Sequence, residues 1–309
     1  MESKILSYFS PGIQKALKLP ELTDIFINND TVFVKTQSDQ YELERVVGSM
    51  RVVINEIANY CGTVVNVDNP ILEVMFAGFR ITATIPPISA RCNMSIRKPN
   101  PHIIKMVDYI ERGQLSQSHY EFLSNAISNH KNILVVGGTG SGKTTFSNAL
   151  LDRMVELSPP GHRIVILEDI DELQCSIPNQ VKYLTSHCAD MTRLLKVAMR
   201  SNPERILVGE VRDKSALDLL KSWNTGSPGG IATIHANGCE EGLQRIIDLA
   251  MEAGVPAPFS LVQHTVDVLV FIESKRTEEG FVRKVKEVAS VTGFNRNTEK
   301  FSLEQIKGE

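Results

Sequence analysis

The sequence predicts an α/β protein of two domains: a smaller α+β domain followed by a doubly wound α/β domain with a parallel sheet. Its 309 residues exceed what one typical hydrophobic core organises. Short strand patterns and turns dominate the first third, whereas apolar runs alternate with helical patterns in the remainder. The prolines of Lys98–Pro101 cannot continue a strand ladder. We therefore expect the first domain over residues 1–98, a linker over 99–118 and the second domain over 119–309.

The N-terminal domain is expected to contain two hairpins, a helix and a last short strand. In each hairpin, a turn separates two runs rich in β-branched and aromatic residues. Pro86 and Pro87 end the second hairpin. The expected strands are Asp24–Asp30, Val32–Lys35, Ile71–Phe76, Phe79–Ile85 and Met94–Arg97, and the expected helix is Ser49–Tyr60.

The C-terminal domain is expected to hold four short strands in a parallel sheet. Near-continuous apolar runs are typical of strands that are buried on both faces. In such sheets, ligands bind beyond the carboxyl ends of the strands, so the polar residues that follow each run are candidates for the site. The four runs are Ile133–Val136, Arg163–Leu167, Arg205–Val208 and Gly230–Ile234.

A glycine-rich turn directly after the first of these strands has the spacing of a phosphate-binding P-loop. Gly137 is followed by four residues and then by Gly142, Lys143 and Thr144. Backbone N–H groups of such a turn surround phosphate oxygens, and the helix that follows adds its positive end. The alternative, a glycine-rich loop without chemistry, is disfavoured because a strand precedes the loop and a helical pattern follows it. The predicted ATP-binding residues are Gly138, Thr139, Gly140, Ser141, Gly142, Lys143, Thr144 and Thr145.

Within this loop, Lys143 is expected to reach the β- and γ-phosphates of ATP. Thr144 provides a hydroxyl where such sites hold Mg²⁺. ATP and Mg²⁺ are therefore the predicted ligands of the C-terminal domain.

Three later strand ends supply candidate catalytic side chains. Glu168, with Asp169 beside it, could orient a water molecule, or could belong to a solvated acidic loop. Glu210 is the first choice for catalysis and for a metal contact, since a carboxylate after a hydrophobic strand can meet Mg²⁺ and the attacking water. The alternative is a structural pair with Arg212. His235 could sense the γ-phosphate by hydrogen bonding, although a lone histidine is usually structural.

Composition excludes several classes of protein. The net charge of −3 and the absence of a block of like charge argue against direct nucleic-acid binding. Five scattered cysteines without a C-x-x-C pair indicate neither a zinc site nor a disulfide framework. No apolar run approaches the length of a membrane span, so we expect a cytoplasmic protein that partners recruit.

The phosphate loop, Glu168–Asp169, Gly209–Glu210 and the glycine-rich segment with His235 follow one another in an order that resembles the secretion ATPase superfamily. Its members are the hexameric motors of type IV secretion, type II secretion and type IV pili. The segments 192–213 and 223–230 are similar to its conjugal-transfer branch, and the likeness covers nearly the whole chain. It implies a RecA-like ATPase domain, with ATP bound between the two domains of a subunit. The segments Phe79–Thr82 and Ser95–Lys98 match those that supply phosphate-directed arginines, here Arg80 and Arg97. Strand-edge charges without a catalytic role are the alternative for both.

The resemblance implies a Mg²⁺-dependent hexameric ATPase that powers substrate transfer or apparatus assembly in type IV secretion or conjugation. Its partners would be further copies of itself and apparatus proteins of the inner membrane. A four-cysteine metal module frequent in type II secretion relatives is missing, which disfavours that branch. Alternatives are a type IV pilus or type II secretion motor, or a docking switch that binds ATP and turns over very slowly. A RecA-like strand-exchange enzyme or helicase ranks last, because the sequence shows no basic groove with aromatic residues.

Overall fold

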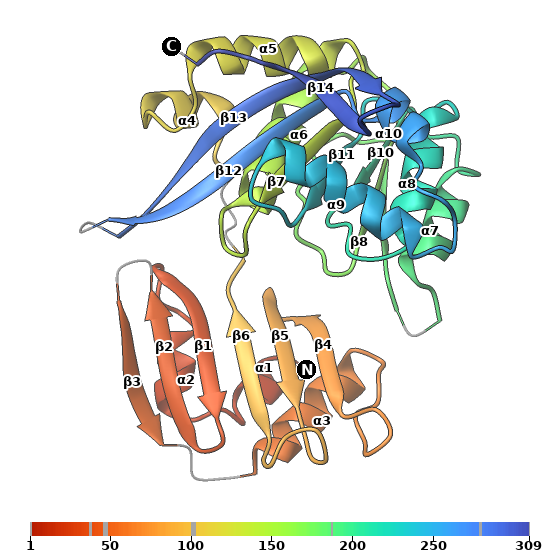
Figure 1. Ribbon diagram of the computed structural model, residues 1–309. Helices are drawn as coiled ribbons and strands as arrows, with labels where there is room; N and C mark the ends of the chain where they lie inside the picture. Colours follow the sequence, from red (N-terminus) through yellow and green to blue (C-terminus); the bar gives the residue numbers. More distant parts are fainter. Residues whose placement is uncertain are drawn as a thin grey trace. The chain divides into compact units, whose positions relative to one another are not determined.

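Two compact units, residues Met1–Pro101 and His102–Glu309, make up the computed structural model. The structure describes residues 2–36, 39–45, 49–99, 103–186, 188–277 and 280–308. Figure 1 traces the chain through both units. The mixed α/β class predicted from the sequence is confirmed.

The first unit is an antiparallel sheet of six strands with three helices on one face. The strand order is β3-β2-β1-β6-β5-β4. Ile25 and Ile27 alternate toward the helices, where they pack with Ile13, Ile54 and Ile57 in one core. The two expected hairpins, the helix and the last strand are confirmed. The elements are α1 (Glu2–Leu6), α2 (Pro11–Ala16), β1 (Leu22–Asn28), β2 (Thr31–Thr36), β3 (Gln40–Arg45), α3 (Met50–Tyr60), β4 (Ile71–Phe76), β5 (Phe79–Thr84) and β6 (Asn93–Arg97).

The second unit contains an eight-stranded sheet in which six neighbouring strands are parallel. The strand order is β14-β13-β12-β7-β11-β10-β8-β9, and only the pairs β12–β13 and β13–β14 are antiparallel. The strands are β7 (Ile133–Gly137), β8 (Ile164–Glu168), β9 (Gln180–Leu184), β10 (Arg205–Val208), β11 (Ile231–Ile234), β12 (Val268–Thr277), β13 (Gly280–Asn295) and β14 (Lys300–Gln305).

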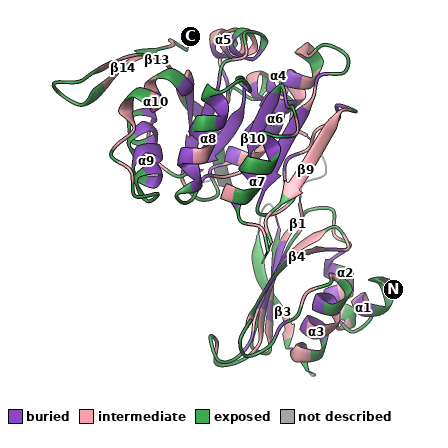
Figure 2. Ribbon diagram, turned by 90° about the vertical axis from the view of Figure 1, so that its right-hand side faces the viewer, coloured by how far each residue is buried: buried purple, intermediate pink, exposed green. Residues whose placement is uncertain are grey.

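Helices cover both faces of this sheet, which makes it doubly wound. Leu134 and Val136 of β7 belong to the core under α7–α10, whereas Ile133 and Val135 belong to the core under α4–α6. Figure 2 shows the central strands buried between the two layers. The helices are α4 (Met106–Glu111), α5 (Gln117–Ser128), α6 (Lys143–Leu157), α7 (Met191–Ala198), α8 (Ser215–Asn224), α9 (Cys239–Met251) and α10 (Phe259–Thr265).

The four apolar runs form the buried strands β7, β8, β10 and β11, as expected. Sequence patterns did not indicate β9 or the C-terminal strands β12–β14. β9 is half-buried along most of its length, so it lacks the apolar signature of a central strand.

The linker expected over residues 99–118 is shorter in the structure, because most of that segment belongs to the second unit. Met106 and Tyr109 of α4 and Leu115 after it are buried in the core that contains Phe146 of α6. The rings of Tyr109 and Phe146 meet edge to face, with centroids 5.2 Å apart. Because the residues around Leu115 are polar, the sequence pattern did not predict that this segment packs in the core.

Candidate nucleotide site

The phosphate loop lies between β7 and α6, and close packing explains its first glycine. A Cβ atom on Gly137 would lie 2.4 Å from Ser141 Oγ and 2.7 Å from the carbonyl oxygen of Ile272 on β12. Gly142, the N-cap of α6, has φ +97°, a left-handed conformation that side chains rarely adopt. The loop therefore needs glycine at both ends.

Lys143 extends back across the loop from the first turn of α6. Its Nζ donates to the carbonyl oxygens of Gly137 at 2.9 Å and Gly138 at 3.1 Å, and it lies 3.1 Å from Nδ1 of His235. The residue is only 7% exposed. Burial lowers the pKa of Lys143, and the nearby carboxylate of Glu210 opposes this shift.

His235 connects Lys143 to Glu210. Its Nε2 lies 2.5 Å from Oε1 of Glu210. Because the lysine ammonium can only donate, Nδ1 of His235 accepts and the ring proton belongs on Nε2. The contact of Nε2 with Glu210 is a close approach, since Oε1 of Glu210 has no hydrogen bond of regular geometry among the described residues. Burial, and next the charge of Lys143, lower the pKa of His235, so the ring is neutral at pH 7. The residues that follow β10 and β11 thus meet the loop after β7 through a continuous series of contacts, Lys143–His235–Glu210.

Arg212 holds the other side of the Glu210 carboxylate. Its Nη2 donates to Oε2 of Glu210 at 2.5 Å, and its Nη1 lies 3.5 Å from Oδ2 of Asp169. Asp169 in turn accepts a 2.9 Å bond from Thr185 Oγ1. The pairing of Glu210 with Arg212, offered above as an alternative to catalysis, is therefore present beside the contact with His235.

Glu168, at the end of β8, is turned into its own loop. Oε1 accepts the backbone N–H groups of Glu172 at 3.0 Å and Leu173 at 2.8 Å. Oε2 is buried with no hydrogen-bond partner in the part of the chain that the structure describes. Burial raises the pKa of Glu168 to about 7 against the opposing effect of the two backbone bonds. This geometry shapes the loop, and a direct catalytic role for Glu168 remains a prediction.

The remaining polar residues of the loop lie just before α6 or in its first turn. Ser141 is 3% exposed, and its hydroxyl lacks a partner among the described residues. Thr144 and Thr145 are half-buried in the first turn of α6. A threonine hydroxyl and the Glu210 carboxylate are hard oxygen donors of the type that Mg²⁺ takes, so these residues fit a magnesium ion that also binds phosphate and water. Within the described ranges, no cluster of three or more His, Cys, Asp or Glu side chains could hold a metal by itself.

The two arginine candidates lie in the first unit, side by side on one face of its sheet. Arg80 pairs with Arg97 across β5 and β6, and Arg97 pairs with Asp24 across β6 and β1. Nε of Arg97 donates to Oδ1 of Asp24 at 2.9 Å, while the arginine side chain stays 60% exposed. The structure thus brings the arginines together with a carboxylate, and their roles toward ATP remain predictions.

Trp223, in the segment that resembles conjugal-transfer proteins, serves the fold. Its Nε1 donates to the carbonyl oxygen of Ile206 at 3.1 Å. A Cβ atom on Gly230 would lie 2.1 Å from this nitrogen. The glycines of the following segment therefore admit the indole ring against β10.

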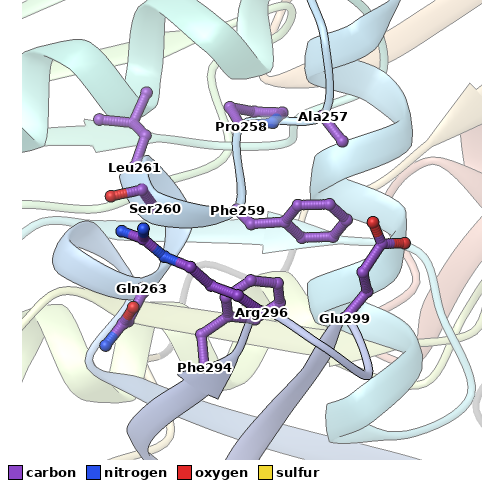
Figure 3. Close-up of a pocket in the computed structure, with 9 residues that line it drawn as sticks. All are labelled: Ala257, Pro258, Phe259, Ser260, Leu261, Gln263, Phe294, Arg296 and Glu299. Carbon is purple, nitrogen blue, oxygen red and sulfur yellow. The ribbon is translucent and has the colours of Figure 1, made fainter.

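A hollow of about 470 Å³ lies apart from these strand ends, between the start of α10 and the turn that joins β13 and β14. Figure 3 shows Phe259 and Phe294 on its wall, with Arg296 and Glu299 at its rim. The two rings stack with centroids 4.7 Å apart. None of the residues that line it belongs to the phosphate loop, so it is not the nucleotide site.

Among the described residues, no helix is long and apolar enough to cross a membrane.

A buried strand, a glycine-rich loop that carries a lysine, and a carboxylate at the end of another strand of the same sheet define a P-loop nucleoside triphosphatase. The chain belongs to the type II/IV secretion system protein family, which matches residues 26–296. The resemblance to this family noted in the sequence is thereby confirmed.

Named relatives agree with this assignment. The probable conjugal transfer protein TrbB of Sinorhizobium fredii is 39% identical over 259 residues, which cover 83% of this chain and 78% of that protein. The fold is similar to that of the Legionella pneumophila ATPase DotB, with TM-score 0.65, 18% identity, and coverage of 95% and 82%. It is also similar to the VirB11 ATPase of the Brucella suis type IV secretion system, with TM-score 0.50, 23% identity, and coverage of 94% and 95%. At these identities the solved structures support the fold.

Proposed function

We propose that this chain is a Mg²⁺-dependent ATPase that powers substrate transfer or apparatus assembly in a type IV secretion or conjugation system. The conjugal transfer relative that matches most of the chain supports this branch over pilus and type II secretion motors. We further propose that six copies form the working ring. Apparatus proteins of the inner membrane would recruit that ring.

The series of contacts Lys143–His235–Glu210 is the observation that supports the proposed mechanism. The loop amides of residues 138–145 would hold the phosphates of ATP. Lys143 would exchange its two carbonyl contacts for β- and γ-phosphate oxygens. Since His235 now accepts from Lys143, that exchange would release Nδ1 and make the ring sensitive to the presence of phosphate.

Glu210 is the proposed catalytic carboxylate. His235 and Arg212 contact its two oxygens from different sides, so its orientation is set before ATP arrives. Glu210 would then orient the attacking water, and with Thr144 it would hold Mg²⁺. The bound ion would neutralise charge on the phosphates. Glu168 would act by shaping the loop beside Gly209, where a Cβ atom would lie only 3.0 Å from the glutamate Cγ.

Arg80 and Arg97 are proposed to direct positive charge to the phosphates from the first unit. The permanent charge and forked shape of a guanidinium suit that task. Asp24 would keep Arg97 extended until the nucleotide offers a stronger anionic partner. Hydrolysis and phosphate release would remove that partner and so link chemistry to a change in domain arrangement.

The test of the phosphate loop is Lys143→Ala, with Lys221→Ala on the exposed face of α8 as the matched control. We expect the first variant to stay folded and lose ATP hydrolysis, because the loop geometry depends on glycines. The control should hydrolyse ATP like the parent. Turnover retained by a folded Lys143→Ala protein would refute the assignment.

Particle mass with and without ATP tests the ring, and steady-state turnover tests the motor. A monomer under both conditions would contradict the hexamer. Tight ATP binding with almost no turnover by the assembled protein would favour the nucleotide-controlled docking switch instead.

A further inference from the structure

An arginine from the C-terminal part of the chain lies across the phosphate loop. Nε of Arg283, on β13, donates to the carbonyl oxygen of Gly140 at 3.2 Å. A Cβ atom on Gly142 would lie 2.9 Å from Arg283 Cδ, so the alkyl stem passes directly over this glycine. The side chain therefore covers two glycines of the loop. No sequence motif pointed to it, because 143 residues separate Arg283 from Gly140.

The neighbouring backbone holds Arg283 in this place. Two residues further along β13, Val285 is 3% exposed in the core beneath α4–α6. Its N–H donates to the carbonyl oxygen of Gln114 at 2.9 Å, which ties β13 to the segment between α4 and α5. Because side chains alternate along a strand, Arg283 lies on the same face as Val285, and Lys284 lies on the opposite face. The backbone at Arg283 is thus fixed beside a buried residue, while Arg283 itself is exposed.

The peptide group between Gly140 and Ser141 explains what this contact can do. A trans peptide is planar, so its C=O and N–H point in opposite directions. The Ser141 N–H donates to the carbonyl oxygen of Gly138 at 3.3 Å, inside the same loop. The Gly140 carbonyl consequently points outward, to the guanidinium. Arg283 therefore holds the carbonyl end of a peptide group whose N–H end is bonded to Gly138 within the loop.

Such a restraint matters because the loop is rich in glycine. Gly140 has φ +72° and Gly142 has φ +97°, conformations in which glycine is free and other residues are strained. A rotated Gly140–Ser141 peptide would present its carbonyl dipole, rather than its N–H, to an anion. Rotation of the peptide would break the hydrogen bond to Arg283, and a hydrogen bond from a charged donor is stronger than one from a neutral donor.

We propose that Arg283 is a positioning residue for nucleotide binding, which holds the Gly140–Ser141 peptide so that its N–H, and not its carbonyl, is offered to the phosphates of a nucleoside diphosphate or triphosphate. The Ser141 N–H would then exchange its bond to Gly138 for a phosphate oxygen. The inference rests on the phosphate-binding role proposed above for residues 138–145. It makes the β12–β13 pair a structural part of the nucleotide site. Arg283 acts on the loop that receives ATP, whereas Glu210 is the residue proposed to act on the reacting atoms.

The test compares Arg283→Gln, Arg283→Lys and the control Lys284→Gln, which removes the same charge from the next residue on the opposite face. ATP and ADP affinities are measured by titration of each full-length variant, together with kcat and KM for hydrolysis. We expect Arg283→Gln to bind both nucleotides on the order of tenfold more weakly, as for the loss of one charge-assisted bond. KM should rise by a similar factor, while kcat stays within about twofold.

Arg283→Lys should recover most of the affinity, since an ammonium can still donate to the Gly140 carbonyl. Lys284→Gln should match the parent. Parent-like affinity of Arg283→Gln, or an equal loss in Lys284→Gln, would overturn the proposal. Lys143→Ala separates this failure from a failure of the proposed function. If Lys143→Ala loses hydrolysis while Arg283→Gln behaves like the parent, the phosphate loop stands and only the role of Arg283 falls.

Discussion

Glu168 should make the second unit less stable as the pH rises, and Glu168→Gln should remove that effect. Its pKa in the folded protein is raised to about 7, mainly by burial. The folded state therefore binds the proton more tightly than the unfolded chain, in which a glutamate titrates near pH 4.5. The stabilisation is complete below about pH 4 and is lost as the pH rises through about 7.

The size of the effect follows from the shift, from 4.5 to about 7. At 1.36 kcal/mol per pKa unit, this carboxyl lowers the free energy of unfolding by about 3 kcal/mol between about pH 4 and about pH 8. Glutamine keeps an oxygen that can accept the N–H groups of Glu172 and Leu173, but it does not titrate. The stability of Glu168→Gln relative to the parent should therefore increase by about 3 kcal/mol across that range.

The chain offers a convenient probe for this measurement. Trp223 is its single tryptophan and is 3% exposed in the core of the second unit. Its fluorescence during urea unfolding reports on the unit that contains Glu168. Glu304→Gln, which makes the same change at an exposed position on β14, is the control. Parallel pH profiles for the parent and Glu168→Gln would refute the reasoning.

Three further outcomes are expected. Glu210→Gln should bind ATP but hydrolyse it at least about a hundredfold more slowly, because the amide keeps the shape and loses the charge; parent-like turnover would pass the catalytic role to Glu168. Arg97→Ala should lower turnover on the order of a thousandfold with ATP affinity nearly intact, whereas unchanged turnover would make Arg97 a surface residue. Gly230→Ala should lower the free energy of unfolding by about 1–3 kcal/mol, since its Cβ would lie 2.1 Å from Trp223 Nε1 and 2.2 Å from the Ile206 carbonyl oxygen; an unchanged urea midpoint would contradict this packing.

Local sequence determined the phosphate loop and most of the secondary structure around it. The strand from Ile133, the glycines and the helix from Lys143 are contiguous, so their spacing alone indicates the geometry. The hairpin turn at Ala77–Gly78 is equally local, because both residues adopt positive φ, of 50° and 79°. The family resemblance was visible for the same reason, since its motifs are short and ordered along the chain.

Tertiary structure decided which of the polar strand ends meet. Glu168 and Glu210 both follow buried strands, yet only Glu210 contacts His235, while Glu168 turns into its own loop. No local pattern separates these two carboxylates, because the difference depends on how neighbouring strands pair. The proton on Nε2 of His235 is likewise assigned from a lysine 92 residues away.

The sequence by itself determined that a phosphate loop exists and which family the chain belongs to, because the loop is contiguous and the family is indicated by short motifs in a fixed order along the chain. The tertiary structure alone decided that α4 joins the second core and that Arg283 covers the loop. Those contacts join segments far apart in the chain, and their residues, a polar-flanked helix and one arginine in a basic strand, carry no pattern of their own. These contacts form only when the strands pair into a sheet, so no sequence motif could predict that β13 places Arg283 against the phosphate loop.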